Sequence, residues 1–430
     1  MSPSPPFGAA AVLIAMLSAT TILSQFFRSS TTVIAPELIR DLALTPEALG
    51  LANSAFFFAL LAIQVPVGIL FDRIGVRLTV AGLAILAVVG ALMHAVVTTG
   101  TGLTTARFLL GLGHGGSFMS TVVLCSHWYR RERWSTVMSW VFALSMLGVV
   151  LAGTPLALAS EYMGWRAAFT VMAGVSALVG MLFLLLVRND PPGHAKMEQK
   201  AESAREAVGG FVEILRLPGL LRVLGLQTIA YAVMASIMGL WAGPYLHDVH
   251  GLDVVARGNV LIAMAIGQTL GVLSFGPLDR RFDTRKWVAV AGASVTIAIL
   301  IGLAIEPRLP TWLAIGLLIA LCAASSYGVV VVTHARAFYP PRLAGRGATT
   351  ANMAQLIGCA LVPLGTGFIP ALFPISASGY APVAYQWIFA TIAAALVLGL
   401  AIYLTSRDVK PSAAPMSFDP SDKDRACTGR

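Results

Sequence analysis

Long apolar runs recur through this chain and constrain its fold more than any other feature. A membrane-spanning helix needs roughly 20 mostly apolar residues. Only 11% of the residues are charged, whereas soluble domains carry about 25%. The sequence therefore predicts an all-α membrane protein with twelve transmembrane helices. We expect them at about residues 8–34, 49–71, 78–97, 102–125, 135–158, 167–187, 219–243, 256–278, 287–305, 311–333, 348–372 and 383–405.

A long polar connection divides these runs into six and six. We expect residues 1–187 and 219–405 to form two six-helix bundles, joined by a cytoplasmic central loop over 188–218 and followed by a cytoplasmic tail over 406–430. The first run lacks a basic stretch before it and a clear cleavage site after it, so we expect it to be retained as the first span.

The basic residues predict the orientation. With the N-terminus inside, the outer loops hold only Arg40, Arg166, Arg257 and Arg308, and the spans hold Arg28 and Arg107. The other 23 of the 29 lysines and arginines then fall in inner loops and tails, which the positive-inside rule favours. We expect both termini in the cytoplasm and the chain in the plasma membrane, a bacterial inner membrane. Basic residues scattered over short loops argue against a nucleic-acid partner.

Two arginines interrupt the apolar runs, Arg28 in the first and Arg107 in the fourth. A charge near the centre of a bilayer costs roughly 2.5–3.5 kcal/mol on insertion scales. A guanidinium stays charged and presents a planar fork of donors that matches a carboxylate or phosphate. We expect both to face a water-filled cavity and bind an anion. The alternative is that each lies close enough to the outer end of its span to reach the interface.

His114 follows Arg107 by seven residues and therefore shares its helix face. With a reference pKa near 6.5, a histidine can exchange a proton under physiological conditions. His114 is our candidate for substrate binding and proton coupling. A neutral, hydrogen-bonded histidine among packing glycines is an equal alternative. His94, near the outer end of its span, is expected to face water.

The second half offers polar side chains without charge at five positions within its spans. Buried amides and phenols in a membrane span should face protein or water. They are candidates for substrate contacts, and the alternative for each is a hydrogen bond between helices. The residues are Gln227, Tyr231, Gln268, Asn352 and Gln355.

Two similar segments follow the second and eighth runs, at 68–77 and 276–286, and each contains an Asp-Arg pair. Similar segments at corresponding points of two halves predict parallel repeats about an axis along the membrane normal. Transport would follow by rocking one half against the other. We expect the pairs Asp72-Arg73 and Asp279-Arg280 to act as gating latches at the cytoplasmic ends.

The first segment resembles the loop motif of the major facilitator superfamily, G-x-L-a-D-R-x-G-R-[RK]. The motif matches at Gly68, Leu70, Asp72, Arg73, Gly75 and Arg77, and departs at Phe71 and Val76. The stretch from Arg107 to Gly113 fits the R-x-x-x-G-x-G pattern of the fourth span, and Gly164-Trp165-Arg166 fits the turn before the sixth. The resemblance implies a secondary transporter that works by alternating access.

The spacing from Arg28 to Pro36 is similar to that of the organophosphate:phosphate antiporters and the related anion:cation symporters. This likeness implies that Arg28 binds the anionic group of the substrate. The antiporters carry a second arginine in span seven, where this chain has Ala235. The symporters place a proton-coupling glutamate where His114 stands. No span interior is expected to hold Asp or Glu.

These observations favour a transporter of a small organic anion of the carboxylate type, with proton coupling through His114 or the substrate left open. One alternative is an exporter of drugs or metal-chelate complexes, although the G-P-x-x-G-G signature of drug antiporters is missing. Another is a transport-dead membrane sensor. We expect no enzymatic activity, metal or cofactor, and a monomer whose partners are the lipid bilayer and the anionic solute.

Overall fold

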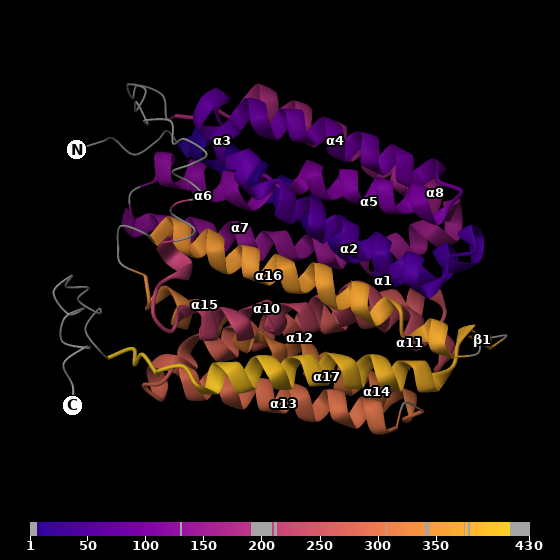
Figure 1. Cartoon of the computed structure of the whole chain (residues 1–430). Coiled ribbons are helices and arrows are strands. Elements are labelled where there is room, and N and C mark those ends of the chain that lie inside the picture. Colours follow the sequence, from indigo (N-terminus) through magenta and orange to yellow (C-terminus); the bar gives the residue numbers. More distant parts are fainter. Residues whose placement is uncertain are drawn as a thin grey trace, which may run out of the picture.

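The computed structural model describes residues 7–129, 131–190, 209, 213–306, 308–339, 344–373, 375–376 and 379–412. Long helices run side by side across the molecule (Figure 1). We call the end at which α1 begins and α17 ends the terminal end. The opposite end is the hairpin end, because it carries a two-stranded antiparallel hairpin in which Ile375 pairs with Tyr380. The expected all-α architecture is confirmed.

The first half of the chain forms one group of helices. They are α1 (Phe7–Leu42), α2 (Pro46–Ala62), α3 (Gln64–Ile74), α4 (Val76–Val96), α5 (Gly100–His114), α6 (Ser117–Trp128), α7 (Arg131–Ala152) and α8 (Thr154–Leu186). Within this group α4 packs on α5 and α8, and α1 packs on α7.

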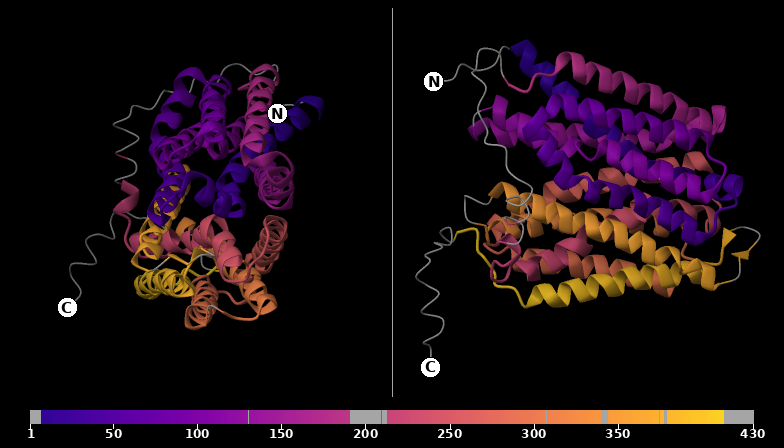
Figure 2. Two further views of the ribbon diagram at one scale, coloured as in Figure 1. Left: turned by 90° about the vertical axis from the view of Figure 1, so that its right-hand side faces the viewer. Right: turned by 45° about the horizontal axis from the view of Figure 1, so that its top comes forward.

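The second half forms the other group, and the two groups lie one above the other when the bundle is seen end-on (Figure 2). Its elements are α10 (Leu220–Ser236), the π-helical turn η1 (Ile237–Trp241), α11 (Ala242–Asp248), α12 (Val254–Arg281), α13 (Lys286–Ile305), α14 (Thr311–Ala324), η2 (Ser325–Tyr327), α15 (Gly328–Arg336), α16 (Ala344–Gly367), η4 (Pro370–Leu372), β1 (Ile375–Ser376), β2 (Gly379–Tyr380) and α17 (Pro382–Leu404). The halves meet where α2 packs on α16 and where α12 packs on α7 and α8.

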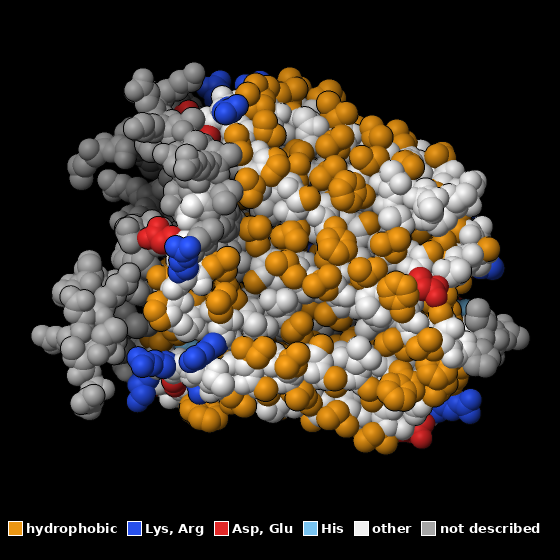
Figure 3. Space-filling view, in the orientation of Figure 1, with side chains coloured by type: hydrophobic (Ala, Val, Ile, Leu, Met, Phe, Trp, Pro, Cys, Tyr) orange, Lys and Arg blue, Asp and Glu red, His pale blue; other side chains and the backbone are white. Residues whose placement is uncertain are grey.

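Within the described residues, ten helical runs are long and apolar enough to cross a membrane, or eleven if α2 and α3 count as one bent span. The longest, Thr136–Leu186, has 51 residues and is kinked at Gly164, whose φ is 79°. Apolar side chains cover the middle of the face seen in Figure 3, and charged ones lie towards its two ends. This distribution is the one that a lipid environment favours.

Helix α1 is longer than the sequence predicted. We expected the first span to end at residue 34, but the helix continues through Pro36 and Glu37 to Leu42. Glu37 therefore lies inside a spanning helix, and the prediction that no span holds an acidic residue was wrong. The carboxylate is tolerated because it pairs with Arg257 of α12. The longer helix also places Arg28 well away from either of its ends.

Two spans of the first half are broken at the same place. Helices α2 and α3 bend by 41° at their junction, and α5 ends at His114 just before α6 begins. A Cβ atom on Gly115 would lie only 2.0 Å from Cγ2 of Ile63, the residue between α2 and α3. The breaks can therefore meet only because residue 115 has no side chain. They leave Gln64 and His114 at helix ends beside the space between the halves.

Residues after the last helix of each half brace an equivalent loop at the terminal end. The amide of Arg77, at the start of α4, donates to Asn189 Oδ1 over 2.9 Å. The amide of Lys286, at the start of α13, donates to Asp408 Oδ1 over 3.1 Å. Asn189 and Asp408 each follow an arginine after the final helix of their half. The remainder of the central loop (191–208 and 210–212) and of the tail (413–430) lies outside the described residues.

Candidate functional site

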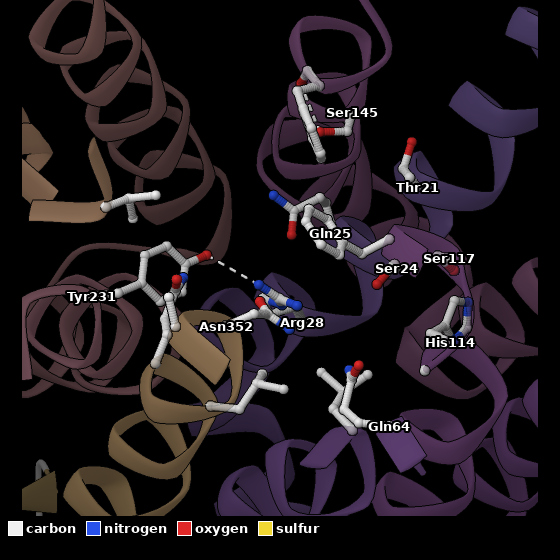
Figure 4. A pocket seen from close by; sticks show the side chains of 18 of the residues that line it. Thr21, Ser24, Gln25, Arg28, Gln64, His114, Ser117, Ser145, Tyr231 and Asn352 are labelled. Carbon is white, nitrogen blue, oxygen red and sulfur yellow. Dashed lines mark hydrogen bonds between the residues drawn. The ribbon is translucent and has the colours of Figure 1, made fainter. Parts of the chain in front are cut away.

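A cavity of about 370 Å³ lies between the two halves, within the size range of small-molecule sites. It receives side chains from both groups of helices (Figure 4). The first half contributes Thr21, Ser24, Gln25, Arg28, Leu60, Gln64, His114, Gly115, Ser117, Phe118, Phe142, Ser145 and Met146. The second half contributes Gln227, Tyr231, Gln268, Val332, Ala348, Ala351, Asn352, Gln355 and Leu356.

Arg28 brings the fixed positive charge of α1 into this cavity. Its Nη1 donates to the Tyr231 hydroxyl of α10 over 3.1 Å, and Figure 4 shows this bond crossing between the halves. The guanidinium carbon lies 5.5 Å from the centre of the Phe57 ring, and its buried Nε has no hydrogen-bond partner among the described residues. Arg28 thus keeps donors that an anionic ligand could use.

The second-half candidates lie where the sequence suggested. Gln227, Tyr231, Gln268, Asn352 and Gln355 all line the cavity. Gln227 Nε2 donates to Gln355 Oε1 over 3.3 Å, which joins α10 to α16. These two amides therefore both join the helices and form part of the cavity wall.

Arg107 is not among the cavity-lining residues, so the expectation that it shares a wet cavity with Arg28 was wrong for this structure. Its side chain is fully buried within the first half. Nη1 donates to the Phe27 carbonyl over 2.6 Å and Nη2 to Asn53 Oδ1 over 3.1 Å, and the guanidinium lies over the Phe56 ring. These contacts join α5 to α1 and α2.

We expect the dissociation constant of the Arg107→Met variant for an anion to stay within about threefold of that of the unmodified protein. Arg107 does not line the cavity, and both of its Nη atoms donate to groups of the protein. The measurement is calorimetric titration of the purified variant with a carboxylate that the unmodified protein binds. If a folded variant binds the carboxylate tenfold or more weakly, Arg107 contributes to anion binding after all.

His114 lines the cavity and is anchored at one nitrogen. Its Nδ1 lies 2.9 Å from the Leu110 carbonyl, and a carbonyl can only accept, so Nδ1 carries the hydrogen. Nε2 is then the atom that can gain or lose a proton. The ring also packs on Phe27, with 5.1 Å between ring centres.

The sequence predicted that His94 faces water, but the structure shows that its side chain is fully buried. Its ring stacks on Phe169 with 3.9 Å between centres and an angle of 5°, and meets Trp165 edge-on. Neither of its nitrogens has a hydrogen-bond partner among the described residues. Aromatic packing accounts for a histidine that the hydropathy pattern placed at the surface.

Sequence reasoning missed the polar lining of the first half. Six further hydroxyl and amide side chains face the cavity, namely Thr21, Ser24, Gln25, Gln64, Ser117 and Ser145. A usable signal was present on α1, where Thr21, Gln25 and Arg28 recur at intervals of four and three residues and so share a helix face.

The sequence also missed an ion pair between the halves at the hairpin end. Arg257 Nη2 of α12 lies 2.5 Å from Glu37 Oε1 of α1. The side chain of Arg257 is 1% exposed and that of Glu37 is 21% exposed. The sequence pattern places Arg257 in an outer loop and gives no sign of a partner on α1.

Side-chain hydrogen bonds and one close approach of backbones join the halves at the same end. Thr32 Oγ1 donates to the Met238 carbonyl over 2.6 Å, and Thr154 Oγ1 lies 2.6 Å from Asn259 Oδ1. A Cβ atom on Gly243 would lie 1.7 Å from the Thr32 carbonyl oxygen, so α11 can approach α1 this closely only with glycine. The halves are therefore in tight contact between the cavity and the hairpin end.

The predicted gating residues lie at the terminal end. Gly68, Asp72 and Arg73 are on α3, and Gly75 follows this helix with a φ of 85°. Arg77 Nε donates to the Leu184 carbonyl over 2.6 Å. In the second half, Asp279 lies 3.7 Å from Arg285, and Arg280 is exposed. The contacts of Arg77 and Asp279 lie within one half, and a latching role for this group stays a prediction.

A family model described as the Major Facilitator Superfamily matches residues 17–363. The chain belongs to this superfamily. The resemblance that we drew from the loop motif and the fourth span is thereby confirmed.

Two relatives of this superfamily member are named for organic anions. A protein of Agrobacterium vitis named "Putative tartrate transporter" is 25% identical over 279 residues, which cover 60% of this chain and 61% of the relative. The chain thus spans less than two thirds of that relative. An Escherichia coli (strain K12) protein named "Probable galactarate/D-glucarate transporter GudP" is 21% identical over 391 residues, covering 83% of this chain and 86% of the relative.

The fold is shared with solved structures of low sequence identity. A bacterial homologue of the human lysosomal transporter Spinster, in an inward-facing and unoccupied conformation, superposes with a TM-score of 0.74. It is 18% identical, and the match covers 93% of this chain and 97% of that one. At this identity the likeness concerns the arrangement of helices alone.

Proposed function

We propose that this chain is a secondary active transporter of a small organic anion of the carboxylate type, working by alternating access. The observation that carries the proposal is Arg28, a guanidinium in the cavity between the halves. None of the described residues lining this cavity is Asp or Glu. An unneutralised cation in a partly desolvated cavity whose other polar groups are uncharged favours a ligand that brings the negative charge.

The relatives support the same class of substrate. Tartrate, galactarate and D-glucarate, for which two of them are named, are all hydroxylated carboxylates. The hydroxyl and amide side chains around Arg28 suit such molecules, because each can donate or accept a hydrogen bond to a substrate hydroxyl.

We further propose that the chain crosses a bacterial inner membrane twelve times and has both termini in the cytoplasm. At 1.5 Å per residue, the 51 residues of Thr136–Leu186 would extend about 77 Å, whereas a bilayer core is about 30 Å thick. A break at Gly164 divides this segment into two spans. The terminal end then faces the cytoplasm, and the ion pair Glu37–Arg257 closes the outer side.

A thermal-shift screen of the purified protein tests the substrate class. We expect carboxylates of four to six carbons to raise the midpoint of unfolding in proportion to their occupancy of the cavity, and phosphate esters and cationic drugs to leave it unchanged. Stabilisation by cationic drugs alone would favour the exporter alternative. Binding of carboxylates without flux in proteoliposomes would favour a sensor.

Proton coupling is proposed at His114, whose Nε2 is its titratable atom. If His114 is the coupling site, His114→Gln should abolish uphill accumulation driven by a proton gradient while leaving substrate exchange intact, because glutamine cannot carry the proton. Both rates are measured in proteoliposomes with labelled substrate. Undiminished accumulation in the variant would rule out this role.

A further inference from the structure

The number of cationic side chains in the cavity limits how many negative charges of a ligand can be neutralised. Among the described residues that line the cavity, Arg28 is the only one with a fixed charge, and His114 is the only other that can become cationic. Arg107 points away, into the first half, and donates to protein groups. The second half adds amides and a phenol to the wall and no lysine or arginine among these residues.

One guanidinium can neutralise one carboxylate. Arg28 already leans towards the second half through its bond to Tyr231, so a carboxylate on Arg28 would also come within reach of the phenol of α10. With His114 neutral, a second carboxylate on the same ligand would meet only uncharged groups. Hydroxyls and amides can donate hydrogen bonds to it, but they leave its charge uncompensated in a partly desolvated space.

The neutral groups suit substrate hydroxyls instead. Amides come from α1, α3, α10, α12 and α16, and aliphatic hydroxyls come from α1, α6 and α7. Figure 4 shows Gln25, Gln64 and Asn352 on different sides of Arg28. A hydroxylated chain extending from a carboxylate on Arg28 would therefore meet partners on both halves.

We propose that the cavity selects singly charged, hydroxylated carboxylates over dicarboxylates of the same carbon skeleton. This inference rests on the proposed function and narrows it. It also separates this chain from the two relatives, because the anions in their names are dicarboxylates.

Three six-carbon compounds with the same hydroxylated backbone test the charge count. D-glucitol has no carboxylate, D-gluconate has one and D-glucarate has two. Calorimetric titration at pH 8, where an ordinary histidine is neutral, should give gluconate a dissociation constant at least tenfold below those of the other two. Glucarate binding as tightly as gluconate would overturn the inference and leave the proposed function standing. Failure of all three to bind would overturn both for this class of solute.

A second cation in the cavity wall should shift the preference towards the dicarboxylate. Asn352→Lys adds an ammonium to the wall formed by the second half, and Asn352→Met adds a side chain of similar length without charge. We expect the lysine variant to shift the glucarate-to-gluconate affinity ratio at least tenfold towards glucarate relative to the methionine variant. An equal ratio in the two variants would show that charge does not decide the selection.

Discussion

Replacing Arg28 with methionine is expected to weaken carboxylate binding about hundredfold, which corresponds to about 2.8 kcal/mol. Removing one partner of a desolvated, hydrogen-bonded charge pair costs roughly 2–5 kcal/mol, because the other charge is left unpaired. Methionine keeps an unbranched apolar stem as far as the position of Nε and removes the guanidinium that lies over Phe57. The measurement is calorimetric titration of the purified variant with D-gluconate.

The matched control is Arg107→Met, the same replacement at the buried arginine of α5. It removes an equal charge from the same half but leaves the cavity wall unchanged, so its affinity should stay close to that of the unmodified protein. Equal losses in both variants would mean that the two arginines act through the general positive potential of the half. That result would remove the special role given to Arg28.

Replacing Glu37 with glutamine is expected to open the hairpin end. The substitution leaves the Arg257 guanidinium, which is 1% exposed, without its counter-charge. An unpaired buried charge of this kind costs roughly 3–5 kcal/mol, which is enough to shift a two-state equilibrium by more than a hundredfold. Arg257 regains water when the halves separate, so the open state should gain population.

Spin labels at Tyr162 and Leu372 would report this change. These side chains belong to opposite halves at the hairpin end and are 83% and 78% exposed, so labelling disturbs little. Cys427 is replaced by serine, and the buried Cys125, Cys322 and Cys359 stay unlabelled. Electron–electron double resonance should record a longer distance between the labels in Glu37→Gln than in the unmodified protein.

Asp41→Asn provides the control for this experiment. Asp41 lies on the same helix and accepts from Trp165 Nε1 over 2.9 Å, a contact within the first half. Its amide variant should leave the distance between the labels unchanged. If Glu37→Gln also leaves it unchanged, the ion pair does not hold the hairpin end closed.

The sequence predicted the helical architecture and most of the cavity because both depend on local patterns. Long apolar runs require spanning helices wherever lipid surrounds them, and a charged or amide side chain within such a run must face protein or water. For this reason Arg28, His114, Tyr231 and Asn352 could be selected from their positions alone.

The remaining features depend on contacts between residues distant in the sequence. The end of α1 was misplaced because Glu37 reads as a helix-ending polar residue until its partner, 220 positions away, is known. Arg107 and Arg28 look alike in the sequence, and only the bonds to Phe27 and Asn53 distinguish the buried one. His94 was predicted to face water from its place near the end of a span. Its stacking on Phe169 cannot be read from the hydropathy of the sequence.

Flux in proteoliposomes tests the central claim, that Arg28 moves an anion through the cavity between the halves. Vesicles loaded with unlabelled D-gluconate and containing the unmodified protein should take up labelled D-gluconate from outside by exchange. Vesicles containing folded Arg28→Met protein should take up no more than protein-free vesicles. Equal uptake by both proteins would contradict the account, as would the absence of carboxylate exchange by the unmodified protein.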